Sequence, residues 1–335
     1  MNLAIVGITG MVGREMLDVI EQRNLNITKL IPVASKKSKG KSILFMGVRY
    51  KIITLEELLT ENVDIALFSA GSEVSRIWAP KLSLKGVKVI DNSSCWRMND
   101  KYKLIVPEVN GSTLSRKDLI ISNPNCSTIQ LVMGLAPLHR RFNIKRVIVS
   151  TYQAVSGTGK RAVNQLKQEE NKVKKQIVYP HQIYQNVIPQ CDEFIENGYT
   201  KEEMKLTNET KKILDSKIDV VATAVRVPLY RGHSESVNVE FERDFKLEEI
   251  KHELNNMPGV LVLDTPKKHK YPMPFYSQGK DLVYIGRIRR DFTKKNTLNM
   301  WIVADNLRKG AATNTVQIAE HLINNKLIKF LSIKQ

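Results

Sequence analysis

The sequence predicts a two-domain α/β protein in which a doubly wound parallel sheet is followed by an α+β domain. Short apolar runs alternate with amphipathic helical patterns in the first third of the chain, which is typical of parallel sheets. From about residue 144 the apolar runs lengthen and alternate in polarity, as in a mixed or antiparallel sheet. A length of 335 residues also exceeds one domain of roughly 150. We expect domains at 1–125 and 126–306, with a C-terminal helix at about 307–335 completing the first.

The composition is that of a globular protein with an unusual charge. No apolar run approaches the roughly 20 residues of a membrane helix, and the N-terminus lacks the basic start of a signal peptide. Three cysteines without metal-ligand spacing, Cys95, Cys126 and Cys191, suit a reducing compartment, so we expect a cytoplasmic protein without a metal site. The net charge of +18 is spread along the chain without a nucleic-acid-binding motif. We therefore expect small anionic ligands, and neither nucleic acid nor membrane.

The first element is an apolar strand at residues 3–6, followed by a glycine turn and a helix from Arg14. The turn, Gly7-Ile8-Thr9-Gly10-Met11-Val12-Gly13, has the spacing G-x-x-G-x-x-G, a variant of the dinucleotide fingerprint. Glycines at these positions let the backbone approach a pyrophosphate at the helix N-terminus. The strand, turn and helix together predict a dinucleotide cofactor.

The second strand, at residues 29–34, indicates which dinucleotide binds. It ends in Ser35-Lys36-Lys37-Ser38-Lys39-Gly40-Lys41 and lacks the acidic residue that would accept from a ribose 2′-hydroxyl. Basic and hydroxyl groups suit a 2′-phosphate, so Ser35, Lys37 and Ser38 favour NADP over NAD. The alternative is a solvated lysine loop.

Further strand and helix patterns continue the first sheet. Strands are expected at 63–72, 87–94 and 118–121, with a helix at 75–84. The strand ends of such a sheet face the ligand. Arg97 lies just beyond one of these ends and is a candidate anion clamp, with a surface ion pair as the alternative.

Cys126 is the candidate nucleophile. It lies in Ser122-Asn123-Pro124-Asn125-Cys126-Ser127-Thr128, between a strand and the apolar helical pattern of residues 129–135. The dipole and free N–H groups of a helix N-terminus favour a thiolate. The alternative is a small buried hydrophobic cysteine.

The second domain contains the longer strands. The strands are expected at 144–151, 219–227, 235–242, 282–289 and 298–304, with helices at 162–174, 201–214 and 247–255. Residues 267–270 are expected to form a loop. The segment 311–327 has helical periodicity and is expected to pack on the first domain.

This domain also offers a partner for the cysteine. His233 follows a glycine turn just before a strand, and we predict that it acts as a general base on Cys126. Glu202 and Lys205 lie on one face of a predicted helix. They can bind the two ends of an amino-acid-like ligand, or simply pair with each other.

Four motifs in order carry a family resemblance. The opening glycine turn, the segment 122–128, Gln153-Ala154-Val155-Ser156-Gly157-Thr158-Gly159 and Gly232-His233-Ser234-Glu235 together resemble the aspartate-semialdehyde dehydrogenase family. The likeness covers nearly the full length, including residues 106–110 and 303–312. It implies a Rossmann-like NADP-binding domain and a second domain for catalysis and dimerisation.

The resemblance also implies roles for single residues. Cys126 would be the nucleophile, His233 the acid/base, and Asn125 would flank the thiol. Gln153 would orient the thioester, Arg97 and Lys205 would hold phosphate, and Glu202 and Arg226 would bind the amino and carboxylate ends of the substrate. The cofactor contacts it implies are Thr9, Gly10, Met11, Val12, Lys37, Ser38, Ser156, Gly157 and Asn306. Lysine stands at Lys37, where relatives often carry arginine, and it binds phosphate as a point charge.

The implied reaction is the NADP-dependent reductive dephosphorylation of L-4-aspartyl phosphate to L-aspartate 4-semialdehyde through a cysteine thioester. It belongs to the biosynthesis of lysine and diaminopimelate, threonine and methionine, and the implied assembly is a homodimer or a dimer of dimers. The alternatives are an N-acetyl-glutamyl-phosphate reductase, whose motif usually has glycine where this chain has Asn125, or a basic nucleotide- or nucleic-acid-binding protein.

Overall fold

The structure is a computed structural model that describes residues 1–173 and 178–328. It divides into two compact units, Met1–Pro124 with Ala311–Gln335, and Asn125–Gly310. The sequence-based boundaries at 125/126 and 306/307 differ from this division by one and four residues. Within the described ranges, no helix has the length and apolar character that crossing a membrane requires.

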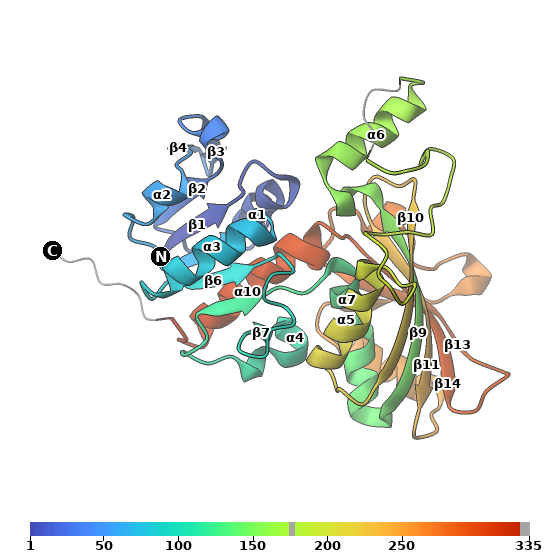
Figure 1. Ribbon diagram of the computed structural model, residues 1–335. Coiled ribbons are helices and arrows are strands. Elements are labelled where there is room, and N and C mark those ends of the chain that lie inside the picture. Colours follow the sequence, from blue (N-terminus) through green and yellow to red (C-terminus); the bar gives the residue numbers. More distant parts are fainter. Residues whose placement is uncertain (174–177, 329–335) are drawn as a thin grey trace. The chain divides into compact units, whose positions relative to one another are not determined.

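The first unit contains a six-stranded sheet in which every pairing is parallel. Leu3 and Ile5 of its β1 strand belong to one apolar core, and Ala4 and Val6 belong to a second, because strand side chains alternate between the two faces. Helices cover both faces (Figure 1), so the doubly wound sheet is confirmed. The strand order is β2 (Lys29–Val33), β1 (Asn2–Val6), β5 (Ile65–Phe68), β6 (Lys88–Asp91), β8 (Ile120–Ser122) and β7 (Lys103–Leu104). The helices are α1 (Met11–Gln22), α2 (Leu55–Leu58), α3 (Ser72–Ser83), α4 (Pro107–Asn110) and α10 (Thr313–Asn324).

Helix α10 belongs to this unit although it lies at the other end of the chain. Val316, Ala319 and Leu322 join the core cluster that contains Leu3 and Ile5, which confirms the predicted packing. The predicted length was wrong, since a π-helical turn at Arg308–Ala312 precedes the helix and Asn324 ends it. Lys326 has a φ of +53°, and the N–H of Leu327 returns to the carbonyl of Leu322, which closes the helix as a Schellman motif does. The last seven residues of the expected helix, 329–335, lie outside the described residues.

A two-stranded hairpin, β3 (Ser42–Phe45) and β4 (Val48–Lys51), was not predicted. Its two turn residues, Met46 and Gly47, both have positive φ, as a type I′ turn requires. Met46 is an unusual residue at the first turn position, where asparagine or aspartate is preferred, so the sequence carried little hairpin signal.

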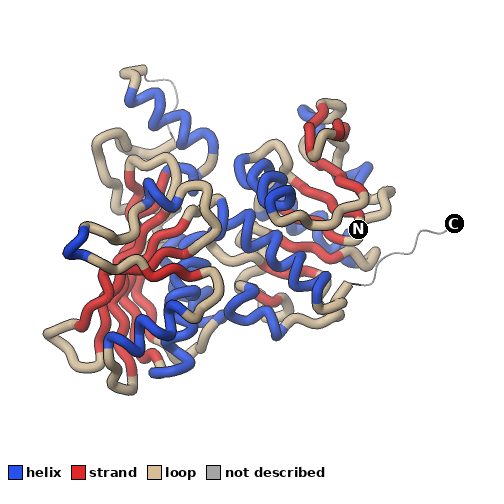
Figure 2. Tube along the Cα trace, turned by 180° about the vertical axis from the view of Figure 1, so that it is seen from behind, coloured by secondary structure: helices blue, strands red, loops and turns tan. Residues whose placement is uncertain are grey.

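The second unit is built on a mixed six-stranded sheet, as predicted (Figure 2). Two edge pairings, β9 with β10 and β12 with β13, are parallel, and the three central ones are antiparallel. The strand order is β10 (Asp219–Val227), β9 (Ile144–Ala154), β11 (His233–Phe241), β14 (Thr297–Ala304), β13 (Val283–Arg290) and β12 (Val260–Val262). The helices are α5 (Cys126–Phe142), α6 (Lys160–Glu170), α7 (Lys201–Ile213), α8 (Leu247–Asn255) and α9 (Pro274–Ser277).

Two predicted boundaries in this unit were wrong. Strand β11 begins at His233 and not at 235, because His233 already pairs with Ala304 of β14. Helix α6 ends at Glu170, and Lys172 beyond it has a left-handed φ of +58°; residue 174 of the predicted helix is outside the described residues. The loop expected at 267–270 contains a 3-10 turn at Pro266–Lys268.

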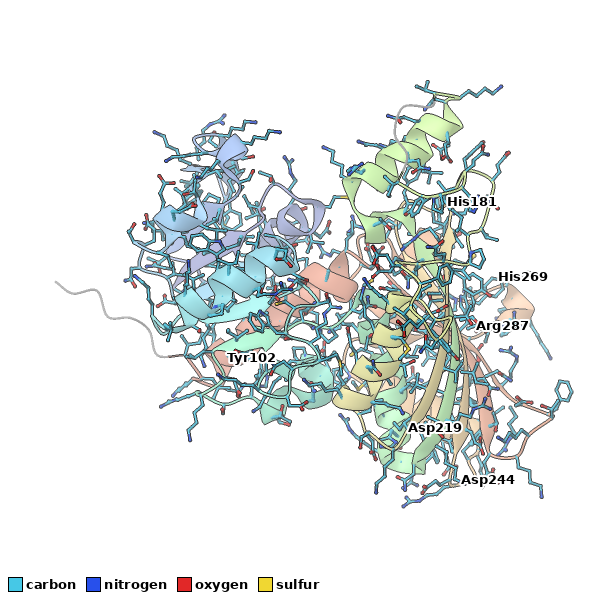
Figure 3. All side chains as sticks on the ribbon, in the orientation of Figure 1. Tyr102, His181, Asp219, Asp244, His269 and Arg287 are labelled. Carbon is cyan, nitrogen blue, oxygen red and sulfur yellow. The ribbon has the colours of Figure 1, made fainter. Side chains whose placement is uncertain are left out.

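Helix α5 packs on one face of the sheet, against β9, β11, β13 and β14. A Cβ atom at Gly134 would approach the Cδ1 atoms of Ile302 and Ile285 to 2.9 and 3.1 Å, so the glycine allows this close packing. Figure 3 shows Asp219, where β10 starts, and Asp244, just after β11, at the same end of the sheet. The end of β10 and the start of β11 therefore meet at the opposite end, where the candidate site lies.

Candidate active site

Cys126 is the first residue of α5, as predicted. Asn125 caps the helix, since its Oδ1 accepts from the N–H groups of Ser127 at 3.0 Å and Thr128 at 3.4 Å. Cys126 is only partly buried and is in no disulfide, so the alternative of a fully buried hydrophobic residue does not describe it. A Cβ at Gly310 would lie 3.0 Å from the Cβ of Cys126, so glycine leaves the space beside the thiol.

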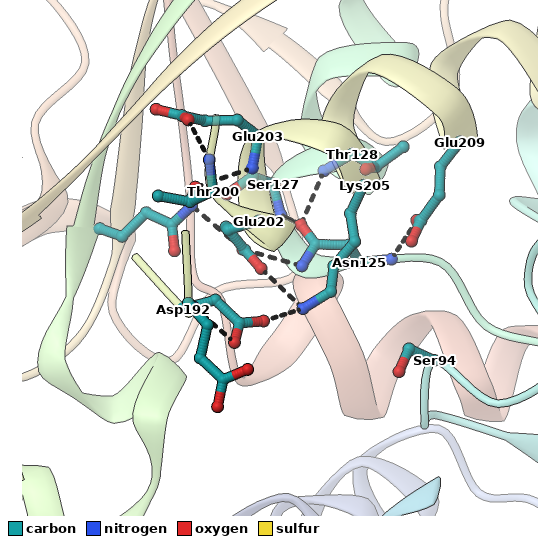
Figure 4. A network of polar contacts seen from close by, with 12 residues as sticks. Ser94, Asn125, Ser127, Thr128, Asp192, Thr200, Glu202, Glu203, Lys205 and Glu209 are labelled. Atoms are coloured by element: carbon teal, nitrogen blue, oxygen red, sulfur yellow. Dashed lines mark hydrogen bonds and ion pairs between the residues drawn. The ribbon is translucent and has the colours of Figure 1, made fainter. Parts of the chain in front are cut away.

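Asn125 also connects the start of α5 to α7. Its backbone N–H donates to Glu209 Oε2 at 2.7 Å, and its Nδ2 donates to Glu202 Oε1 at 2.9 Å. Helix α7 begins at Lys201 because Thr200 and Glu203 form a capping box, which places Glu202 in the first turn. The residue before Cys126 is therefore held by two carboxylates, as Figure 4 shows.

Glu202 and Lys205 form the ion pair that was the alternative to ligand binding, with 3.1 Å between Lys205 Nζ and Glu202 Oε2. Burial disfavours the charge of Glu202, but Lys205 and the Asn125 amide outweigh burial and lower its pKa. Burial likewise disfavours the charge of Lys205, but Glu202 and Asp192 raise its pKa. Both groups are charged at neutral pH, so the site contains a fixed anion beside a fixed cation.

Gln153 lies on β9 in the same network and is buried. Its Nε2 donates to Glu202 Oε1 and to Thr151 Oγ1, both at 3.2 Å. Gln153 and Arg226 are direct neighbours across the parallel pair of β9 and β10. The register of these two strands therefore brings together two predicted site residues that are far apart in sequence.

Arg226 is buried near the end of β10, and its Nη1 donates to the carbonyl of Ala154 at 2.8 Å. Its Nε has no hydrogen-bond partner among the described residues. A Cβ at Gly157 would lie 3.0 Å from Arg226 Nη1 and 3.2 Å from His233 Nε2, so both side chains border this glycine. The arrangement leaves the Nε–H of the guanidinium for an anionic group.

His233 is fully buried and follows Gly232, whose φ is +93°. The N–H of Ala154 donates to its Nδ1 at 3.0 Å, so the neutral ring carries its proton on Nε2. Burial, followed by the nearby charge of Arg226, lowers the pKa of His233 to about 3. The predicted general base is therefore, in this state, a neutral hydrogen-bond donor at Nε2, which has no partner among the described residues.

Cys191, to which the sequence assigned no role, is buried in the field of Arg226, Glu202 and Cys126. Burial raises the pKa of its thiol to about 12, so it stays protonated and is not a competing nucleophile.

In the first unit, Arg97 is buried, so it is not the surface residue that the alternative assumed. Its Nε donates to the carbonyl of Asn123 at 2.9 Å, and its Nη2 donates to that of Asn92 at 2.7 Å. These carbonyls follow the ends of β8 and β6, so the guanidinium is oriented at the carboxyl edge of the parallel sheet.

The glycine turn connects β1 to α1 as predicted. Gly7 has a φ of +89°, and a Cβ there would lie 2.2 Å from the carbonyl oxygen of Ser69, so only glycine fits. Gly10 is the N-cap and provides no side-chain cap, which leaves the first N–H groups of α1 to a ligand. Ser35, Lys37 and Ser38 follow β2, and the N–H of Gly7 bonds to the last residue of β2, Val33. The two predicted cofactor segments of this unit are therefore neighbours at one sheet edge, and Thr9, Met11 and Val12 lie in the first of them.

The remaining predicted cofactor residues lie in the second unit. Asn306 Nδ2 donates to Ser156 Oγ at 2.9 Å, and its Oδ1 accepts from the N–H of Gly232 at 2.9 Å. This side chain therefore connects Ser156 and Gly157 to the glycine turn before His233.

Sequence reasoning missed Asp192 and Glu209. Asp192 accepts from Lys205 Nζ at 2.7 Å but comes from a loop 13 residues earlier, so no periodic pattern marks it. Glu209 follows Glu202 by seven residues on α7, and this spacing on one helix face was a usable signal.

Comparisons with known proteins agree with this geometry. The family models described as "Semialdehyde dehydrogenase, NAD binding domain" and "Semialdehyde dehydrogenase, dimerisation domain" match residues 2–117 and 135–309. Aspartate-semialdehyde dehydrogenases of Aquifex aeolicus and Bacillus subtilis are 50% and 45% identical to the chain, and each alignment covers 98% of the chain and 99% of the relative. The crystal structure of aspartate semialdehyde dehydrogenase II from Vibrio cholerae superposes with a TM-score of 0.92 at 42% identity, covering 97% of this chain and 98% of that one.

The likeness extends over both units, at an identity well above what a shared fold alone would give. The parallel cofactor-domain sheet, the mixed sheet and the ordered motifs all match it, so the resemblance noted from the sequence is confirmed. The chain belongs to the aspartate-semialdehyde dehydrogenase family, whose members are oxidoreductases.

Proposed function

We propose that this chain converts L-4-aspartyl phosphate to L-aspartate 4-semialdehyde through a thioester on Cys126, with NADPH as the reductant. The observation that carries the proposal is the position of Cys126 at a capped helix N-terminus whose cap is bonded to the charged pair of Glu202 and Lys205. A structure of the Vibrio cholerae relative is described as a complex with ASA, which supports a substrate of this class.

The covalent step begins with attack of the Cys126 thiolate on the acyl phosphate carbonyl. The C–S bond forms, the bond to the phosphate oxygen breaks, and inorganic phosphate leaves with the electron pair. Bound NADPH supplies the hydride that reduces the thioester. The resulting thiohemiacetal then breaks its C–S bond, which releases the aldehyde and returns the thiolate.

His233 would act from Nε2 in these steps. Because Nδ1 is committed to the N–H of Ala154, Nε2 can donate to the carbonyl oxygen as negative charge develops on it. An anionic substrate beside the ring would raise the pKa of His233. Because an imidazolium carries a proton on both nitrogens, transfer of a proton from Nε2 at collapse would also require the Ala154 N–H to move away from Nδ1. Gln153 would orient the acyl group from the neighbouring strand.

Charges in the site suit the ends of an amino-acid substrate. Ionised Glu202 would bind the ammonium group, Arg226 the carboxylate, and Lys205 with Arg97 the phosphate. An N-acetylated substrate has no ammonium to pair with Glu202, which argues against the N-acetyl-glutamyl-phosphate reductase alternative. A side-by-side assay of the two substrates separates these functions, and turnover of the acetylated compound alone would refute our choice.

The cofactor site fits a dinucleotide phosphate. Gly7 and Gly13 let the turn pack tightly on neighbouring backbone, since a Cβ would lie 2.2 Å from the Ser69 carbonyl oxygen at Gly7 and 2.4 Å from the Gly7 carbonyl oxygen at Gly13. The uncapped N-terminus of α1 offers N–H groups to the pyrophosphate. Lys37 and Ser38 would contact the 2′-phosphate, since the described chain after β2 has basic and hydroxyl groups and no carboxylate at this turn. Kinetics with NADP and NAD test the preference, and equal use of NAD would contradict it.

The central test is phosphate-dependent reduction of NADP with aspartate semialdehyde. Cys126→Ser is expected to abolish turnover. Thiol alkylation is expected to inactivate the wild type and the Cys95→Ser variant equally. Cys95→Ser is the matched control, because Cys95 is another partly exposed thiol. Full activity of Cys126→Ser would refute the covalent mechanism.

The second unit is the proposed site of self-association, because residues 135–309 match a dimerisation domain. We propose a homodimer or a dimer of dimers, which light scattering at several concentrations would distinguish.

The pathway to lysine and diaminopimelate, threonine and methionine follows from the proposed product. The three free cysteines support the expected cytoplasmic location.

A further inference from the structure

A buried polar pair lies outside the contacts used by the proposed mechanism. Gln130 of α5 and Glu235 of β11 are both completely inaccessible to solvent. All four polar atoms of these side chains, the Gln130 amide nitrogen and oxygen and both Glu235 carboxyl oxygens, have no hydrogen-bond partner of ordinary geometry among the described residues. Buried polar groups without partners are costly, so this pair requires an explanation.

The pair lies directly behind the reacting groups. Gln130 follows Cys126 by four residues, which places both on one face of α5. Glu235 follows His233 by two residues, which places both on one face of β11, and α5 packs against that strand. Gln130 and Glu235 therefore form a second layer beneath Cys126 and His233.

Glu235 has two neighbours across the sheet. They are Thr151 on β9, whose hydroxyl accepts from Gln153 and has one O–H of its own, and the apolar Ile302 on β14. Burial raises the pKa of Glu235 well above its usual range, and the opposing influence comes from the Gln130 amide, with no cation involved. A carboxyl group in these surroundings is neutral at physiological pH.

The protonated form resolves the unsatisfied atoms, whereas the carboxylate does not. A carboxylate only accepts, so it could use one N–H of Gln130 but would leave the Gln130 oxygen without a donor. A carboxylic acid donates its O–H to the amide oxygen and accepts the amide N–H at its carbonyl. The two bonds form a closed ring that pairs one acceptor and one donor from each side chain.

We propose that Glu235 is a positioning residue, which as a neutral acid forms this two-bond ring with Gln130 and fixes the first turns of α5 on β11 beneath Cys126 and His233. The effect on catalysis rests on the proposed roles of those two residues, whereas the ring itself does not. A side chain that bonds α5 to β11 at this point sets the distance between thiol and imidazole.

Two substitutions at Glu235 distinguish a side chain that forms the hydrogen-bonded ring from one that only fills the same space. Glu235→Gln keeps two reciprocal hydrogen bonds, because two primary amides form the same kind of ring, and kcat is expected to stay within about twofold. Glu235→Leu fills similar space without a partner for Gln130, and kcat is expected to fall about ten- to a hundredfold with KM nearly unchanged, as misplacement of reacting groups predicts. Equal kcat values for the two variants would overturn the proposal.

Infrared difference spectroscopy tests the ring independently of activity and of the Leu variant. Wild type minus Glu235→Gln, both at neutral pH, is expected to show the carbonyl band of a protonated carboxylic acid that shifts on Gln130→Leu substitution. A carboxylate band in its place would overturn the proposal even if the proposed reaction holds. If the band is found and the enzyme acts on a different substrate, the ring stands and the proposed function fails.

Discussion

Asn125→Ala is expected to lower the free energy of unfolding by about 2.5–3 kcal/mol. The substitution removes the helix-cap acceptor for Ser127 and Thr128, which is worth about 1 kcal/mol. It also removes the donor to ionised Glu202, and a hydrogen bond to a charged group contributes about 1.5–3 kcal/mol. We use the lower part of that range because Glu202 keeps Gln153 and Lys205 as donors.

Urea unfolding followed by circular dichroism measures this loss, and Asn125→Ser is the matched control. Serine retains a cap acceptor but has no amide to donate to Glu202, so about 1 kcal/mol of the loss is expected to return. The catalytic rate is expected to fall in both variants, since both remove the Asn125 bond that helps to orient Glu202. Equal unfolding free energies for the Ala and Ser variants would refute the separation of the cap from the Glu202 bond.

Three further predictions concern charge, space and pH. Glu202→Gln is expected to raise the KM for aspartate semialdehyde about tenfold or more, because it removes the proposed partner of the ammonium group, and an unchanged KM would exclude that contact. Gly157→Ala is expected to lower kcat/KM about tenfold or more with little change in melting temperature, since its Cβ would displace Arg226 and His233, whereas wild-type kinetics would show that the space is not needed. Because the folded pKa of His233 is about 3, the unfolded chain alone binds a proton between that pH and about 6.5. In urea unfolding, the free energy of unfolding of the wild type is therefore expected to fall relative to that of His233→Gln as pH falls through this window. A difference between the two proteins that stays constant with pH would contradict a buried neutral ring.

The parts of the fold that follow local rules were predictable. The start of α5 at Cys126 follows from Asn125 as a cap before an apolar run. Strand β10 matched its predicted range, because it is rich in valine, which favours strands. The β3–β4 hairpin was missed because Met46 adopts a positive φ that its residue type does not indicate. Local propensity therefore succeeded where residue type and backbone agreed.

The candidate site was predictable in its residues but not in their states. The family motifs identified His233, yet its tautomer depends on the N–H of Ala154, a backbone group that no sequence pattern marks. Arg97 was expected to be an anion clamp, but its orientation by the carbonyls of Asn92 and Asn123 could not be read from the sequence. Asp192 was missed because its contact with Lys205 is set by a loop conformation.

The bonds around Cys126 differ in how far along the chain they reach, and this has a consequence for how the enzyme matures. The Asn125 cap joins residues two and three apart, so it can form as soon as α5 forms. The bond from Asn125 to Glu202 spans 77 residues, and that from Ala154 to His233 spans 79, so both await closure of long loops. A nascent or refolding chain therefore has a helix-terminal thiol at Cys126 before Glu202 and His233 are in place around it. The thiol is most exposed to oxidation and alkylation in that interval.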